Sequence, residues 1–169
     1  MGGFLQRAWC LLRGVATPDD LDRPLLDRLQ TRWAAAGIKP RPGVSPEAIV
    51  WFEDRYQVVL QPAVRAYFEA VDGTGDEVDG HYFRFWPFAE FAPVAEDRSW
   101  GPGEAARFEG WFLFADHMID APDFAVRLSS EAAGVGPVAC LYDAELLDVA
   151  PSFEAFLASY LAHPMGVVV

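Results

Sequence analysis

The spacing of the apolar residues changes twice along this 169-residue chain, and that change constrains the fold more than any other feature. Helical spacing dominates up to about residue 73, short strand-like runs follow between residues 81 and 142, and helical spacing returns after residue 151. Helices, then clustered strands, then a helix is the order of an α+β domain with a mostly antiparallel sheet. It is not the order of alternating βαβ units.

Four helices are predicted from their start signals and apolar stripes. The first begins at Thr17-Pro18 and continues to about Ala36, where Gly37 ends it. The second begins at Ser45-Pro46, the third at Pro62 and the last at Pro151-Ser152. The stripes of the last three are Ile49, Phe52 and Tyr56; Val64, Tyr67, Phe68 and Val71; and Phe153, Phe156, Leu157, Tyr160 and Leu161.

Strand-like runs lie at residues 81–86, 111–115, 124–128 and 137–142. A short helical turn is expected over residues 87–94, and exposed loops over residues 74–80 and 97–103. Asp143-Ala144-Glu145 is interpreted as the turn that follows the last strand. Aromatic residues are abundant, with 6 Trp, 13 Phe and 5 Tyr, and their stripes favour a buried core over a ligand cage.

The chain is strongly acidic, with a net charge of −12 spread along its length. Such a surface repels phosphate groups, which argues against nucleic acid and against anionic membranes as ligands. Acidity serves solubility, and it also steers a basic protein partner toward the surface. No secretory signal and no apolar run long enough to cross a membrane is recognised, so we expect a cytoplasmic protein.

Cysteine and histidine give little sign of catalysis or metal binding. Cys10 and Cys140 are the only cysteines, and they suggest a reducing compartment and no zinc site. The sequence is also compatible with a disulfide between them. Asp116-His117 with Asp120 could hold a metal as a hydrolase does, but no third protein ligand is identified, and a strand end followed by a turn with solvated acids is favoured. No catalytic or cofactor-binding motif is recognised, so we expect neither an enzyme nor a cofactor.

The acidic segment from Asp72 to Asp79 is the least ordinary local feature. It holds Asp72, Asp76, Glu77 and Asp79, and it follows a helix C-terminus, where acidic side chains are electrostatically unfavourable. A solvated loop explains it, and so does a binding surface. The predicted partner-binding residues are these four together with Asp116 and Asp120.

Several motifs together resemble the SUKH superfamily, which includes the Smi/Knr cell-wall regulators of fungi and many bacterial immunity proteins. The motifs are Ile49-x-x-Phe52-Glu53-x-x-Tyr56, Leu60 and Pro62, Tyr67-Phe68, Asp72-Gly73, Phe85 to Phe91, Phe112 to Asp116, Gly136-Pro137-Val138 and Ser152-Phe153-Glu154-x-Phe156-Leu157. The resemblance spans about residues 31–164. Two departures are Gln61, where the family's Leu-Pro pair has its Pro, and Asp72, where Asn is usual.

The resemblance implies a single α+β domain with a twisted, mostly antiparallel central sheet flanked by helices. We expect a helical extension over residues 1–30, the SUKH-like domain over residues 31–164 and a tail over residues 165–169. It also implies an immunity protein that binds and neutralises a basic toxin domain, a nuclease or a deaminase, as a monomer or weak dimer. An intracellular regulatory scaffold that binds several proteins is the alternative.

Overall fold

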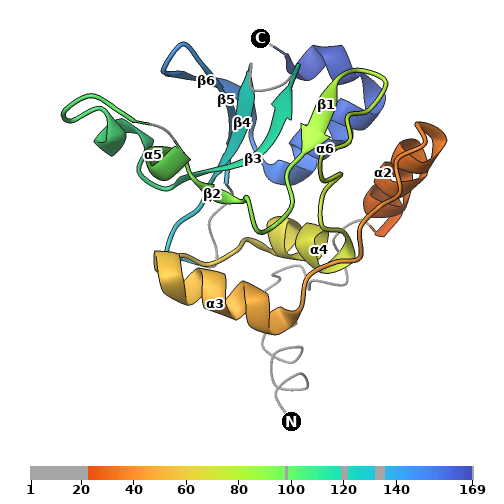
Figure 1. Ribbon diagram of the computed structural model, residues 1–169, viewed down its shortest axis with the longest axis horizontal. Helices are drawn as coiled ribbons and strands as arrows, with labels where there is room; N and C mark the ends of the chain where they lie inside the picture. The colour runs from red at the N-terminus through yellow and green to blue at the C-terminus, as the bar shows by residue number, and fades with distance from the viewer. Residues whose placement is uncertain (1–22, 98, 119–121, 132–135, 169) are drawn as a thin grey trace.

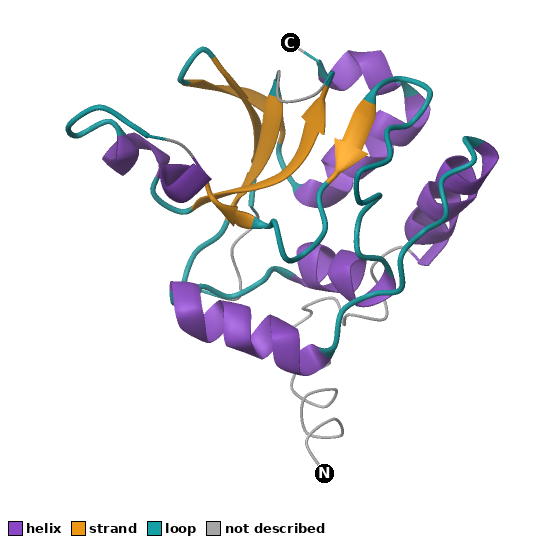
Figure 2. Ribbon diagram, viewed as in Figure 1, coloured by secondary structure: helices purple, strands orange, loops and turns teal. Residues whose placement is uncertain are grey.

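The computed structural model describes residues 23–97, 99–118, 122–131 and 136–168. Its helices are α2 (Arg23–Ala35), α3 (Pro46–Tyr56), α4 (Pro62–Ala70), α5 (Val94–Asp97) and α6 (Phe153–Ala162), with 3-10 turns at Ala105–Phe108 and Pro164–Val167. The strands are β1 (Phe83–Phe85), β2 (Ala92–Pro93), β3 (Trp111–His117), β4 (Asp123–Arg127), β5 (Val138–Tyr142) and β6 (Glu145–Ala150). The α+β class predicted from the sequence is confirmed (Figures 1 and 2).

The predicted helix starts at Ser45 and Ser152 are confirmed by their capping hydrogen bonds. The Ser45 hydroxyl accepts a hydrogen bond from the Ala48 amide at 3.3 Å, and the Ser152 hydroxyl accepts one from the Ala155 amide at 3.1 Å. Each bond satisfies an amide that the first turn of a helix leaves without a partner. The helix start predicted at Thr17-Pro18 lies outside the described residues, and α2 is described from Arg23 onward.

The strands form one sheet in the order β1-β3-β4-β5-β6, and β2 pairs with β3 as well. Every strand pair of this sheet is antiparallel. β1 pairs with β3 at residues 115–117, and β2 pairs with β3 at residues 112–113, so the two short strands share one edge. Figure 1 shows β1 beginning and β3 ending at the same end of the sheet, with α3 and α4 beyond the opposite end.

The main core lies between one face of the sheet and the helices α2, α3, α4 and α6. Aromatic rings dominate it: Phe85 contacts Trp33 at 5.1 Å and Tyr160 at 5.0 Å between ring centroids, and Phe114 contacts Phe156 at 5.2 Å. Such pairs add to the free energy gained by burying their apolar area. The aromatic stripes are therefore core, as the sequence predicts.

A second, smaller core covers the other face of the sheet. The segment that follows β2 contributes Val94 from α5 and Phe108, which pack with Trp86 and Leu113. The ring of Trp100 packs against that of Phe108 in a tilted arrangement, with 4.3 Å between the ring centroids. Both faces of the central strands are thus covered, and all seven residues of β3 are buried.

Strand β6 is a correction to the sequence interpretation, which places Glu145 in a turn. The turn consists of Asp143 and Ala144, with φ values of 49° and 60°, and Glu145 already pairs with Tyr142. Two residues with positive φ form the tight hairpin that Asn-Gly or Asp-Gly usually marks, and Asp-Ala does not carry that signal. β6 is also an edge strand with exposed acids, so its apolar alternation is weak.

Helix α2 crosses the boundary expected between residues 30 and 31. Leu25, Leu29 and Trp33 all enter the main core, and the Trp33 indole donates a hydrogen bond to the Tyr160 hydroxyl at 3.2 Å. Residues 23–35 therefore pack as part of the same body as the sheet. Among the described residues, no helix is long and apolar enough to cross a membrane.

Candidate functional site

The acidic segment between α4 and β1 is held at three points, the first of which is Asp72. Its carboxylate accepts a hydrogen bond from the Phe88 amide at 2.6 Å and pairs with Arg41 at 3.2 Å. The adjoining Gly73 has a φ of 63°, and a Cβ there would lie 2.4 Å from the Phe85 carbonyl oxygen. The segment therefore approaches β1 closely at Gly73, as only glycine permits.

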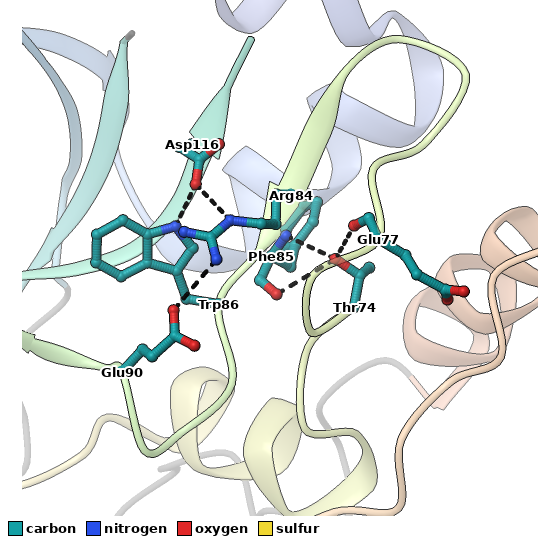
Figure 3. A network of polar contacts seen from close by, with 7 residues as sticks. All are labelled: Thr74, Glu77, Arg84, Phe85, Trp86, Glu90 and Asp116. Carbon is teal, nitrogen blue, oxygen red and sulfur yellow. Dashed lines mark hydrogen bonds and ion pairs between the residues drawn. The ribbon is translucent and has the colours of Figure 1, made fainter. Parts of the chain in front are cut away.

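Thr74 is the second anchor. Its amide donates to the Phe85 carbonyl at 2.8 Å, and its hydroxyl accepts from the Phe85 amide at 3.1 Å. The same hydroxyl donates to the Glu77 carbonyl at 2.7 Å, which closes a turn over residues 74–77. Figure 3 shows the bonds of the Thr74 hydroxyl, with the Glu77 carboxylate pointing away from them.

Asp79 is the third anchor, and it is buried with only 5% of its surface exposed. Its carboxylate accepts hydrogen bonds from the His81 amide at 2.8 Å and the Phe83 amide at 3.0 Å. It also accepts one from the Tyr160 hydroxyl at 2.5 Å and lies 3.8 Å from Arg32. Burial raises the pKa of the Tyr160 phenol, and the Asp79 carboxylate raises it further, so the phenol stays a donor.

The three anchors leave Asp76, Glu77 and Val78 exposed on a segment whose flanks are fixed. Val78 is 40% exposed, and both acids belong to the exposed class. A segment tied to the core on both sides loses little conformational entropy when a partner binds. The geometry therefore suits the presentation of two negative charges at a defined place.

A second polar network joins β1 to β3 next to this segment. The Arg84 guanidinium donates to Asp116 at 2.8 Å and to Glu90 at 3.2 Å, and it lies over the Trp86 ring. The Trp86 indole also donates to the Asp116 carboxylate. Figure 3 shows the Arg84 and Trp86 side chains converging on this carboxylate, which is completely buried. Asp116 thus stabilises the pairing of two strands.

The structure separates the six acids predicted to bind a partner. Asp76 and Glu77 are exposed, and Asp72 is half-buried in its ion pair. Asp79 and Asp116 are buried, and a carboxylate buried among hydrogen-bond donors does not present its charge at the surface. Asp120 lies outside the described residues.

The strand end expected at Asp116-His117 is confirmed, because these are the last two residues of β3, but Asp116 is buried and is not a solvated acid. His117 is buried at the end of β3, with its ring 4.8 Å from that of Phe83. Among the described residues, no group of three or more His, Cys, Asp or Glu side chains could hold a metal ion. Asp120, the third residue of that hypothesis, is outside this part of the chain, as is Cys10.

Sequence reasoning does not single out Tyr82, which follows the acidic segment, or Met118, which pairs with it. They lie beside each other where β1 begins and β3 ends, and both are largely exposed. The sequence pattern places Tyr82 inside a strand and Met118 only within a possible metal motif. No local signal marks them, because their φ values of 63° and 57° are of the kind that glycine usually marks in a sequence.

Comparison with known protein families finds a match over most of the chain. Residues 43–159 match the SMI1 / KNR4 family (SUKH-1), which is more than half of the chain. The matched range contains α3 to β6, most of α6 and the whole acidic segment. No curated protein matches the sequence.

Proposed function

We propose, because the chain belongs to the SMI1 / KNR4 family (SUKH-1), that it is an immunity protein that binds and neutralises a basic toxin domain. The contact includes Asp76 and Glu77. The observation that carries this proposal is the construction of the acidic segment, in which Thr74 and Asp79 fix the backbone while the acids between them face solvent. Fixed, exposed charge is what electrostatic recognition requires.

Membership of the family supports a role in binding a protein toxin, without identifying the toxin. It is associated with immunity proteins that neutralise toxins, its members typically bind protein toxins, and it is generally not catalytic. A nuclease is a fitting target, because an enzyme that binds a polyanion carries a basic surface. A deaminase that acts on nucleic acid has the same requirement.

The net charge of −12 supports fast association with such a partner. Opposite charges steer two proteins into contact and raise the association rate constant, and salt screens that attraction over about 8 Å at physiological ionic strength. The two exposed acids of the segment would attract basic side chains of the partner within the contact itself. The remaining acids contribute a general attraction that is less specific.

The test is the double charge reversal Asp76→Lys/Glu77→Lys, measured against the domain encoded beside this gene. We expect the association rate constant to fall by about 10-fold at low salt and to depend less on ionic strength. Asp54→Lys/Glu109→Lys is the matched control, because it changes the net charge equally at exposed acids away from the segment. Equal effects of the two variants would remove the segment from the contact.

The regulatory scaffold remains the alternative, and the same measurement separates the two functions. An immunity protein binds one partner tightly with 1:1 stoichiometry and protects cells that express the active toxin. A scaffold binds several proteins weakly and gives no protection. Loss of protection in the segment variant, with protection retained in the control, is the result expected here.

A further inference from the structure

Tyr82 and Met118 form an exposed apolar pair at one end of the sheet. The Met118 amide donates a hydrogen bond to the Tyr82 carbonyl at 2.9 Å, directly beyond the last paired residues, Phe83 and His117. Tyr82 is 63% exposed and Met118 is 62% exposed. The two residues therefore extend the pairing of β1 with β3 by one position, and at this position neither side chain enters the core.

The backbone at both positions is in the left-handed region, with φ of 63° at Tyr82 and 57° at Met118. Residues with a Cβ are uncommon there, and Tyr and Met lack the side-chain hydrogen bonds that help Asn and Asp adopt it. Glycine is the ordinary solution for such a turn. Large side chains at two adjacent strained positions point to a role for the side chains themselves, since the turn geometry disfavours them.

The pair is held in place by the same anchor as the acidic segment. The Tyr82 amide donates to the Asp79 carbonyl at 3.0 Å, and the Asp79 side chain binds the amides on both sides of Tyr82. On the other strand, the His117 amide donates to the Pro122 carbonyl at 3.0 Å. An exposed aromatic ring on a backbone this constrained is pre-organised for contact.

We infer that Tyr82 and Met118 are the apolar centre of the contact surface, and that the surface continues along the chain, across the Asp79 anchor, to the exposed residues 76–78. This inference rests on the proposed function. The occupant is a basic protein surface, in which an apolar recess receives Tyr82 and surrounding Lys or Arg side chains face the two acids. Tyrosine is enriched among the residues that dominate binding energy, and methionine adapts its shape to the facing surface.

Charge complementarity selects this occupant over a second copy of the same chain. In a dimer related by a two-fold axis, each copy would meet the same acidic surface on the other. Each copy carries a net charge of −12, so their approach is opposed. A basic partner has neither obstacle.

The exposed aromatic Trp51 provides a control at another place. It is 61% exposed on α3, which Figure 1 shows at the end of the molecule away from the start of β1. Its ring already contacts the Arg55 guanidinium at 5.3 Å. Trp51→Ala therefore removes a comparable exposed aromatic area from outside the inferred surface.

The experiment uses the double variant Tyr82→Gly/Met118→Gly in the full chain. Glycine keeps the left-handed backbone without strain, so the thermal unfolding midpoint should be unchanged or raised. The dissociation constant for the catalytically inactive domain encoded beside the gene should rise by about 30-fold or more, while Trp51→Ala leaves it unchanged. Improved or equal stability together with lost affinity is a result that a purely structural role cannot produce.

Four outcomes would count against the inference or the function on which it rests. Unchanged affinity in the glycine variant overturns it, and a markedly lowered unfolding midpoint does so too, because the side chains would then serve the fold. If the glycine variant binds normally while Asp76→Lys/Glu77→Lys binds weakly, the proposed function stands and only the apolar centre is wrong. If wild-type protein binds no such domain, the proposed function itself fails.

Discussion

The phenol of Tyr160 donates a hydrogen bond of 2.5 Å to the buried carboxylate of Asp79, and so joins the last helix of the chain to the acidic segment. The two residues are 81 positions apart. Their contact makes the placement of the exposed acids depend on the packing of α6 against the sheet. Asp79 is therefore a positioning residue for the proposed contact surface, and it does not touch the partner itself.

The first prediction concerns this contact. Asp79→Ala removes the acceptor of three hydrogen bonds and the ion partner of Arg32, and it should lower the free energy of unfolding by about 3 kcal/mol. Asp76→Ala, at an exposed acid in the same segment, should change it by less than about 0.5 kcal/mol. Urea unfolding followed by tryptophan fluorescence measures both. Similar losses in the two variants would contradict the assignment of Asp79 as the anchor.

The second prediction uses two glycines with similar backbone angles. Gly73 has a φ of 63° and Gly103 a φ of 81°, but a Cβ added at Gly73 would meet backbone atoms within 3 Å, whereas one added at Gly103 would meet nothing within 4 Å. Gly103→Ala should therefore cost only the strain of the left-handed backbone, roughly 1 kcal/mol. Gly73→Ala adds the clash with the Phe85 and Trp86 carbonyls, so its thermal unfolding midpoint should fall clearly further. Equal unfolding midpoints in the two variants would show that β1 shifts to accommodate the added Cβ at no cost in stability.

The elements of the main core follow from the sequence because their signals are local. Ser45 and Ser152 cap their helices, and the stripe from Phe153 to Tyr160 repeats with the period of a helix. Such features involve neighbours within one or two turns. The strands of the central sheet are similarly marked by continuous apolar runs, because both of their faces are buried.

The candidate site could not be predicted to the same extent, because its chemistry depends on distant partners. Asp76 and Asp79 are equivalent acids in sequence, and only the positions of Phe83 and Tyr160 make one of them a buried anchor. Asp116 is buried because Arg84 and Trp86 reach it from another strand. Residue type gives the charge, whereas tertiary packing decides whether that charge faces solvent.

The third prediction compares the two acids that bind Arg84. Asp116 is completely buried, and its loss leaves the Trp86 indole and the Arg84 guanidinium without their shared acceptor, so Asp116→Ala should cost about 3–5 kcal/mol. The Glu90 side chain is 45% exposed and contacts Arg84 at 3.2 Å, so Glu90→Ala should lower the free energy of unfolding by less than about 1 kcal/mol. Chemical denaturation of both variants measures the difference. A large loss of stability in Glu90→Ala would show that the exposed ion pair, and not the buried one, contributes most of the stabilisation by this network.

The last prediction concerns the buried groups that titrate at alkaline pH. Burial raises the pKa of the Cys140 thiol to about 11, and burial also raises the pKa of the Tyr67 and Tyr160 phenols. A raised pKa means that the folded protein holds its protons at a pH where the unfolded chain releases them. The contribution of these three groups to the free energy of unfolding should therefore be constant below about pH 9 and decrease as the pH rises toward 11.

Thiol labelling gives an independent readout of the same burial. In a Cys10→Ser variant, Cys140 is the single thiol, and at pH 8 it should react with a thiol reagent at least about 100-fold more slowly than in urea. Cys140→Ala removes one titrating group, so the decrease of stability between pH 9 and 11 should become shallower but should not disappear. Labelling of the native protein at the rate of a free cysteine, or a pH profile identical in Cys140→Ala, would show that this thiol is not held in the core. The remaining slope in that variant belongs to the two phenols, and Tyr160→Phe should reduce it further.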